Sequence, residues 1–183
     1  MNPTSMAPSL IVSVPQMQDP NFTRSVILLV ESNEDGAFGL VLNRVSPISV
    51  ADICQEHNLA CSRDDHVRIG GPVEQDRAWI LHGGGIRSEH SLEVIDGLWL
   101  AATWQALEGL ADTDEIFRVF LGYAGWGPQQ LEREVTEGTW LLGNLDTEMM
   151  LALIHEQGDE MWRKAIRNMG LEPGHIGPGG GIH

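Results

Sequence analysis

The sequence predicts an α+β fold in a single domain. Strand-like segments lead the chain and helical patterns gather in its second half, whereas regular βαβ alternation would predict a parallel α/β sheet. The chain has 183 residues, which is the length of one ordinary domain. Hydrophobic residues make up 42% of it and charged residues 20%, so we expect a well-developed core.

A β-hairpin is the clearest predicted element of the first half. Residues 26–30 read VILLV, an apolar run without a polar face, which is typical of a strand buried on both sides. Residues 32–36 read SNEDG, which is turn chemistry, and the apolar pattern returns at 38–42. We therefore expect a hairpin over residues 25–43. Further strands are expected at 10–14, 67–69, 78–81, 92–100, 116–123 and 140–142, with a break near Asp96 and Gly97.

Residues that favour helix N-termini mark the predicted helices. Ser, Thr and Asp side chains accept hydrogen bonds from the free N–H groups of a first turn, and proline is favoured at the first helical position. In the last helix, Trp162, Ile166 and Met169 recur at helical spacing and predict a buried stripe. Helices are predicted to begin at Ser49, Thr103, Pro128, Asp146 and Asp159, and to end at Asn58 for the first and Gly170 for the last.

The two ends of the chain differ in composition from its middle. Residues 1–8 read as a loose leader and residues 9–169 as one domain. Residues 170–183 contain six glycines and two prolines, so we expect a flexible tail. The leader lacks the basic start and apolar stretch of a secretory signal, and no apolar run reaches the roughly 18 residues of a membrane helix. These features predict a cytoplasmic protein that does not enter a membrane.

The charge of the chain argues against nucleic-acid binding. Eleven Lys and Arg face 26 Asp and Glu, for a net charge of −15, and no three basic residues are consecutive. A protein that binds DNA or RNA neutralises phosphates with clustered Lys and Arg. We therefore expect no direct nucleic-acid partner, and solubility is the simplest role of the acidity. The partner classes that stay open are another protein, a small molecule and a second copy of the chain.

No residue pattern predicts catalysis, a cofactor or a metal. The chain lacks GxSxG, GxxxxGK[ST], HExxH and a forward GxGxxG. The seven His residues show no spacing typical of metal ligands, so we expect no metal site. The alternative is that histidines far apart in the sequence meet around a metal in the folded chain. Cys54 and Cys61 match neither a CxxC pair nor a zinc site, and we expect two reduced thiols. These observations favour a protein that is not an enzyme.

The densest cluster of special residues spans positions 122–134 and reads GYAGWGPQQLERE. Its glycines let the backbone pass close to a neighbour, and Trp126 between two of them needs a pocket or a partner. If Gly127 caps the following helix, it brings no side-chain oxygen, and the first N–H groups stay free for water or a ligand oxygen. Two interpretations stay open: a strand-to-helix turn with Trp126 buried as a plug, and a contact site for a ligand or partner.

Three smaller clusters predict turns first and a binding rim second. Arg24 stands just before an apolar strand, so we expect it to pair with an acid such as Asp19 or to lie exposed at the end of the sheet. The clusters consist of Asp19, Pro20 and Arg24 before the hairpin, Asn43 and Arg44 after it, and Gly70, Gly71 and Pro72 further along.

In this order, the motifs resemble those of the AlgH/YqgE family of bacterial proteins. The matching segments extend over about residues 9–174, whereas the loop at 83–104 and the tail differ from the family pattern. The segments read LIVSVPQMQDPNFTRSVILLVE, GAFGLVLNR, IGGPVEQDRAWILH, FLGYAGWGPQQLEREVTEGTWLL and MWRKAIRNMGLEPG.

The resemblance implies a fold and leaves the function open. It implies an α+β domain with a mixed, curved and branched sheet, partly closed like a barrel and flanked by helices. Family members have been named as candidate transcriptional regulators after a link to alginate production, and no catalytic residue or ligand carries over. The motif residues that carry over as candidate ligand- or partner-binding positions are Asp19, Pro20, Arg24, Asn43, Arg44, Gly70, Gly71, Pro72, Tyr123, Gly125, Trp126, Gly127, Gln130 and Glu132.

Two functional hypotheses from different classes follow. The first is a regulatory or interaction protein that is not an enzyme and acts on transcription indirectly if at all, through a protein or small-molecule partner. The second is a small-molecule binder or enzyme with a cleft where the glycine-rich turns meet, provided that Arg24 and Asn43–Arg44 lie near the helix start at Pro128. A homodimer that buries an exposed Trp126 region is a further arrangement.

Overall fold

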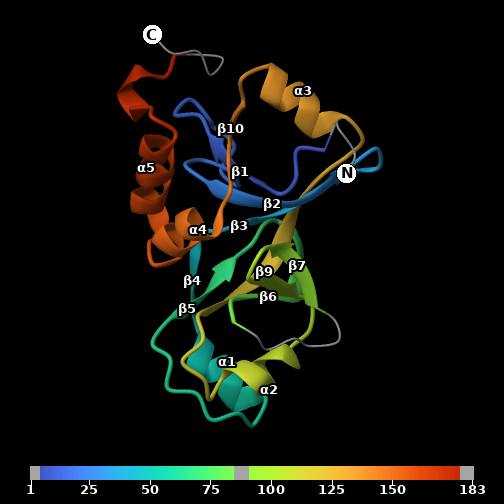
Figure 1. The fold of residues 1–183 in the computed structure, drawn as a ribbon, viewed down its shortest axis with the longest axis vertical. Helices are drawn as coiled ribbons and strands as arrows, with labels where there is room; N and C mark the ends of the chain where they lie inside the picture. Colours follow the sequence, from blue (N-terminus) through green and yellow to red (C-terminus); the bar gives the residue numbers. More distant parts are fainter. Residues whose placement is uncertain (1–4, 85–90, 178–183) are drawn as a thin grey trace.

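The computed structural model describes residues 5–84 and 91–177 (Figure 1). Parts of the predicted leader, of the predicted tail and of the loop at 83–104 lie outside these ranges, as do His90 and His183. The domain boundaries therefore stay a prediction. Within the described ranges, no helix is long and apolar enough to cross a membrane.

Ten strands and five α-helices make up most of the regular structure of the described residues. The strands are β1 (Ser9–Ser13), β2 (Val26–Asn33), β3 (Gly36–Val41), β4 (Val45–Ser49), β5 (His66–Ile69), β6 (Val73–His82), β7 (Ser91–Ile95), β8 (Leu98–Ala101), β9 (Phe117–Trp126) and β10 (Trp140–Gly143). The helices are α1 (Val50–Glu56), α2 (Ala106–Leu110), α3 (Gln130–Thr136), α4 (Thr147–Ile154) and α5 (Gly158–Asn168), followed by a 3-10 helix, η1 (Pro173–His175).

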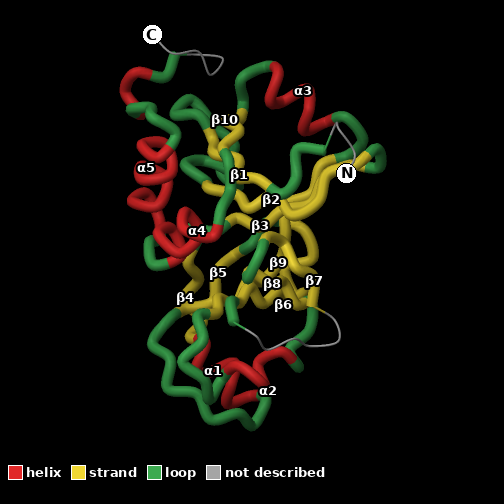
Figure 2. The backbone as a smooth tube through the Cα atoms, in the orientation of Figure 1, coloured by secondary structure: helices red, strands yellow, loops and turns green. Residues whose placement is uncertain are grey.

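The strands form one mixed and branched sheet (Figure 2). Its main path runs β10-β1-β2-β3-β9-β6-β8-β7, so the described sheet stays open, with β10 and β7 as its two ends. It branches at β9, which pairs with β3 and β6 in antiparallel fashion and also with β5 in parallel. The short strand β4 pairs with β5. The predicted α+β class is therefore confirmed, with the sheet open rather than closed into a barrel.

Strands β2 and β3 form the hairpin predicted over residues 25–43. The register pairs Ile27 with Val41 near the base and Asn33 with Gly36 at the tip. The apolar run of β2 is buried on both faces, as predicted: Leu28 belongs to the core under α4 and α5, whereas Ile27 belongs to the core under α3. Because successive strand residues point to opposite faces, this part of the sheet is covered by helices on both sides.

Three apolar clusters hold the helices against the sheet. Helices α4 and α5 pack on one face of β1–β3, where Trp162 and Ile166 of α5 are buried as the predicted stripe requires. Helix α3 packs on the opposite face of the same strands through Leu131. Helices α1 and α2 pack against β5, β6 and β9, around Phe117 and Val119. Figure 1 places these two helices at the end of the molecule opposite α3.

Two of the five predicted helix starts are confirmed as side-chain caps. Ser49 Oγ accepts a hydrogen bond from the Ala51 N–H at 3.1 Å, and Asp146 Oδ1 accepts one from the Met149 N–H at 2.7 Å. Asn58 adopts a left-handed conformation just beyond the end of α1, at the predicted stop. These positions were predictable because a cap is a contact between residues close in sequence.

The predicted starts at Thr103 and Pro128 are wrong. Helix α2 begins at Ala106, after a turn to which Thr103 contributes its backbone carbonyl and not its hydroxyl. Helix α3 begins two residues after Pro128, because Gln129 adopts a left-handed φ of 61° and interrupts the helical backbone. Proline at the entrance therefore marks a turn rather than the first helical residue.

The start predicted at Asp159 is also wrong. Helix α5 begins at Gly158 and has no side-chain cap. The Gly158 N–H instead donates to the backbone carbonyl of Asn43 at 2.8 Å, so a residue 115 positions away takes the place of a local cap. Asp159 lies in the first turn and forms an ion pair with Arg24.

Candidate functional site

The predicted candidate residues fall into three separate places in the structure. The first is the hairpin base, where β2 begins, β3 ends and α5 starts. The second is the fork of the sheet, where the chain enters β6 beside β9. The third comprises the last residues of β9 and the turn from β9 into α3. In this order, the places hold Asp19, Pro20, Arg24, Asn43 and Arg44, then Gly70, Gly71 and Pro72, then Tyr123, Gly125, Trp126, Gly127, Gln130 and Glu132.

Asn43 is the centre of the hairpin base. Its side chain is only 5% exposed. Oδ1 accepts from the Val26 N–H at 3.0 Å, and Nδ2 donates to the carbonyls of Arg24 and Gly158, each at 2.8 Å. One amide thus joins the start of β2 and the end of β3 to the start of α5, and it spends both N–H donors on backbone inside the protein.

The two arginines of the hairpin base are only partly buried and also have partners within the chain. Arg24 forms an ion pair with Asp159 and stacks over Trp162, with 5.5 Å from its guanidinium carbon to the ring centroid. The predicted pairing is therefore confirmed, with Asp159 in the place suggested for Asp19. Arg44 donates to the Asn21 carbonyl at 2.6 Å, which fastens the turn before β2. This turn is built by Asp19, while Pro20 is exposed on it.

A buried arginine lies beneath this region. Arg68 of β5 donates to the carbonyls of Leu42, Ile154 and Glu156 at 2.7, 3.1 and 3.2 Å. The pKa of its guanidinium is lowered to about 10, first by burial and then by the positive charge of Arg118, while Asp65 opposes both. Two of the accepting carbonyls lie at the C-terminal end of α4, which is where a cation favours the helix dipole. Arg68 therefore ties β5 to α4.

The glycines of the fork bring two backbones together. The Gly70 N–H donates to the Leu121 carbonyl, and the Gly70 carbonyl accepts from the Val41 N–H, both at 2.8 Å. A Cβ on Gly70 would overlap the Gly122 carbonyl, and one on Gly71 would overlap the backbone of Tyr123. These glycines therefore pack against β9 at the point where β3 and β5 diverge, with no room for a side chain at either position.

The structure does not bring the hairpin base to the start of α3. Ala37, at the tip end of β3, pairs with Trp126, and the backbone of Gly36 meets Trp126 and Gly127. Asn43 lies at the other end of the same hairpin strand, seven residues from Gly36, which corresponds to about 23 Å of extended chain. The convergence required by the cleft hypothesis is therefore absent.

Trp126 fills a pocket inside the turn from β9 into α3. It is 6% exposed. Glu134 Oε2 accepts from the indole N–H groups of both Trp126 and Trp140, at 3.0 and 2.8 Å. Gln130 donates to the other oxygen of Glu134 at 2.9 Å and accepts from the Gly127 N–H at 3.0 Å. The turn therefore has the geometry of the plug interpretation, and Gln130 binds the Gly127 N–H within it, while α3 itself has no side-chain cap.

An aromatic groove opens on the surface next to Tyr123. The rings of Phe38, Trp79 and Tyr123 lie 4.8 to 6.2 Å apart, and the Arg77 guanidinium carbon lies 4.6 Å from the Trp79 ring centroid. The groove has a volume of about 390 Å³ and crosses six strands and the residue after β8. It is lined by Val30, Glu31, Phe38, Arg77, Trp79, Leu92, Leu100, Ala102 and Tyr123.

Two features of the aromatic groove are unusual: one buried polar atom without a partner among the described residues and one exposed large apolar side chain. The Trp79 indole N–H is buried without a hydrogen-bond acceptor, which costs free energy unless something supplies one. Leu92, on the edge strand β7, is 55% exposed. A large exposed apolar side chain beside an aromatic wall is the composition of a contact surface rather than of an ordinary surface.

An acidic rim continues from the aromatic groove over the hairpin tip. The groove shares Glu31 and Phe38 with a neighbouring hollow that reaches Asp35 and Trp126, and Asn33 belongs both to that hollow and to a third one. We define the acidic rim as the carboxylates that line these three depressions: Glu31, Glu34, Asp35 and Glu132.

The sequence motifs contain only part of this surface. Tyr123 and Glu132 belong to it, whereas Phe38, Trp79 and Leu92 were not candidates. Phe38 pairs with Gly125 and Val73 with Tyr123, so the aromatic side chains meet through strand register between segments far apart in sequence. Periodicity within one segment carries no signal for such a meeting. Among the described residues, no group of three or more His, Cys, Asp or Glu is placed to hold a metal ion.

The fold and its surface define an α+β protein with one open, branched sheet and an aromatic groove bordered by carboxylates. The chain belongs to the AlgH-like family, DUF179, whose family model matches residues 10–174. The resemblance drawn from the sequence motifs is thereby confirmed.

Relatives match over nearly the full length of the chain. A UPF0301 protein of Myxococcus xanthus is 40% identical over 184 residues, which cover 98% of this chain and 99% of the relative. The solution structure of AlgH from Pseudomonas aeruginosa has a TM-score of 0.76 and 32% identity, and the match covers 94% of this chain and 93% of that one. A crystal structure from Corynebacterium diphtheriae, at 23% identity and a TM-score of 0.74, covers 88% of this chain and 86% of its own and shares the fold.

Proposed function

We propose that this protein is a non-enzymatic interaction protein that binds a segment of another protein in the aromatic groove. The bound segment carries an apolar side chain, which fills the groove, next to basic residues, which face the acidic rim. The observation that carries the proposal is the aromatic groove itself, with its three adjoining rings and its exposed Leu92.

The apolar anchor follows from the shape and composition of the groove. Aromatic walls and an exposed leucine gain free energy when an aliphatic or aromatic side chain displaces water from them. Interfaces of this kind depend on a few such central contacts.

The basic flank follows from charge. The acidic rim places four carboxylates beside the groove, and the chain carries a net charge of −15. The one arginine of the groove, Arg77, is 3.3 Å from Glu74 and stacked on Trp79, so its charge is largely offset. Complementary charge speeds association and selects the partner, and its effect weakens with salt.

On this proposal, an effect on transcription passes through the bound protein. The same negative charge that attracts a basic segment repels phosphates, so we expect no binding to duplex DNA at physiological salt. Gel shift with a mixed-sequence duplex tests this point, and retained duplex would replace the indirect route with a direct one.

Selection from a random peptide library displayed on phage, with the purified protein as bait, tests the interaction. We expect selected peptides to share an aromatic or aliphatic anchor followed by Lys or Arg. Leu92→Asp should abolish their binding, because it puts a charge into the groove. Leu142→Asp is the matched control: Leu142 is 48% exposed on β10, at the other end of the sheet, and this variant should bind as wild type does.

The acidic rim is tested separately with the selected peptides. Glu34→Lys combined with Glu132→Lys should weaken binding by about tenfold or more, because it reverses two charges at the rim. Glu56→Lys combined with Glu108→Lys changes the net charge equally at α1 and α2 and should have little effect. The proposal fails if no peptide is selected, or if both pairs of variants behave alike.

A further inference from the structure

Cys54 and Cys61 lie together at the end of α1, outside the surface described above. We infer that they form an oxidisable dithiol, a modification site at which a hydroperoxide converts two thiols into one intramolecular disulfide. The inference is independent of the proposed interaction, since it involves neither the groove nor the rim.

The fold of the loop after α1 brings the two cysteines together. The Asn58 N–H donates to the Gln55 carbonyl at 3.0 Å and the Leu59 N–H to the Cys54 carbonyl at 2.8 Å, with Asn58 in the left-handed conformation. These two bonds are the signature of the Schellman motif, which reverses the chain at the end of a helix. The reversal returns Cys61 alongside the last turn of α1, where both cysteines belong to the same apolar cluster.

The two side chains share this cluster: Cys54 is buried within it and Cys61 packs against it, and among its neighbours Cys61 acts most strongly on the Cys54 thiol. The pKa of Cys54 is raised to about 12, chiefly by burial and next by its neighbour Cys61; Asp65 acts in the same direction and Arg63 opposes them. At neutral pH the buried thiol of Cys54 therefore keeps its proton and is protected from solvent oxidants.

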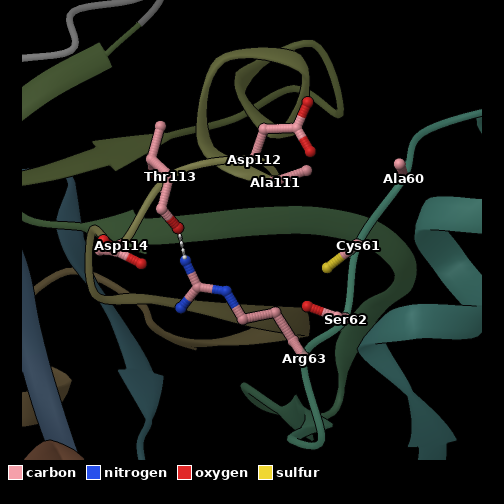
Figure 3. A pocket seen from close by; sticks show the side chains of 8 residues that line it. All are labelled: Ala60, Cys61, Ser62, Arg63, Ala111, Asp112, Thr113 and Asp114. Carbon is pink, nitrogen blue, oxygen red and sulfur yellow. Dashed lines mark hydrogen bonds between the residues drawn. The ribbon is translucent and has the colours of Figure 1, made fainter.

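Cys61 is the thiol that solvent reaches. It is only partly buried and lines an open pocket of about 600 Å³ between the loop after α1 and the loop after α2 (Figure 3). Arg63 crosses the pocket and donates to the carbonyls of Thr113 and Glu115, at 2.6 and 2.8 Å. Its guanidinium also stacks on Phe117 at 4.4 Å, so the wall that carries Cys61 is held in place.

The reaction has two balanced steps. The Cys61 sulfur attacks one oxygen of the hydroperoxide; the O–O bond breaks, the thiol proton goes to the leaving oxygen, and Cys61 becomes a sulfenic acid. The Cys54 sulfur then attacks the Cys61 sulfur; the S–O bond breaks, and the hydroxide leaves with the Cys54 proton as water. With hydrogen peroxide, two thiols and one peroxide yield one disulfide and two waters.

Intact mass of the fully reduced protein after treatment with hydrogen peroxide tests the inference. We expect a monomer that has lost two hydrogens and gained no oxygen, with no thiol left for a maleimide reagent after unfolding, and full reversal by dithiothreitol. A mass that gains oxygen while Cys54 stays reactive to maleimide would overturn the inference, as would a disulfide-linked dimer.

Two single variants separate the roles of the cysteines. Cys54→Ser should stop at oxygenated Cys61, which dimedone traps as a sulfenic acid, and should not lose two hydrogens. Cys61→Ser should keep a reduced Cys54 under the same treatment, because the buried thiol lacks its reactive neighbour. Equal oxidation of Cys54 in wild type and in Cys61→Ser contradicts the assigned order of steps.

Discussion

The hairpin base and the aromatic groove are built on the same strands and use their polar groups in opposite ways. At the hairpin base, Asn43 spends its amide on three backbone groups and Arg24 pairs with Asp159. In the groove, the Trp79 N–H is buried without an acceptor and Leu92 stands exposed. Polar groups whose hydrogen bonds are all made within the chain indicate a structural role. A buried polar group without an acceptor and an exposed leucine indicate a surface that binds a partner.

The comparison separates two meanings of a sequence motif. The motif residues of the sequence, such as Asn43, Gly71 and Trp126, make contacts that hold the fold together. The groove is made mostly of ordinary strand residues whose meeting depends on register. Substitutions in the two regions, compared by their effects on stability and on peptide binding, test this distinction.

The largest effect is expected at Trp162, on the helix that closes the hairpin base. Trp162→Ala should lower the free energy of unfolding by about 3–5 kcal/mol, because it removes a buried aromatic side chain and leaves the Ser13 carbonyl without its indole donor. Chemical denaturation monitored by circular dichroism measures the change. A midpoint equal to that of wild type would mean that α5 is not docked through this residue.

Asn43→Ala should cost about 3 kcal/mol. It leaves the Val26 N–H, the Arg24 carbonyl and the Gly158 carbonyl without their partner in a buried place, and each such loss typically costs about 1–3 kcal/mol before relaxation. Denaturation curves measure the loss, and peptide binding of the folded variant should be unchanged. Weaker peptide binding by the folded variant would show that the hairpin base and the groove are coupled.

Glu134→Ala tests whether the turn from β9 into α3 belongs with the hairpin base. The change leaves the indole N–H groups of Trp126 and Trp140 without an acceptor, so we expect a loss of about 2 kcal/mol. Intrinsic tryptophan fluorescence during denaturation reports both the stability and the environment of these rings. An unchanged free energy of unfolding would indicate that the Trp126 turn belongs with the aromatic groove rather than with the hairpin base.

Local chemistry explains which parts of the fold were predictable. The hairpin turn and the caps at Ser49 and Asp146 depend on residues a few positions apart, and all three are present. Strand β4 has Pro47 in its middle and no local strand signal, since proline is depleted in strands; it survives as a short strand paired only with β5. The parallel pair of β5 with β9 likewise joins segments 52 residues apart, as between Arg68 and Phe120.

The candidate site was less predictable than the fold for the same reason. Composition identified Tyr123 and Glu132 because their motif is unusual, and both lie on the proposed binding surface. Phe38, Trp79 and Leu92 come from three strands whose side-by-side placement is a property of the sheet as a whole. The start of α5 was wrong because its first N–H is bound by Asn43, which no nearby residue indicates.

The smallest effect is expected at Arg24, and it tests whether burial decides how much a polar contact contributes to stability. Arg24 and Asn43 are neighbours with mutual contacts, but Arg24 and its partner Asp159 are about half exposed. An exposed ion pair contributes about 0.5 kcal/mol, and the stacking on Trp162 adds a comparable amount. Arg24→Gln should therefore cost about 1 kcal/mol or less, measured by denaturation at low and at physiological salt. Because salt screens an exposed ion pair, the difference in unfolding free energy between wild type and the variant should shrink as salt is added. A loss as large as that of Asn43→Ala, and insensitive to salt, would mean that charge rather than burial holds the hairpin base together.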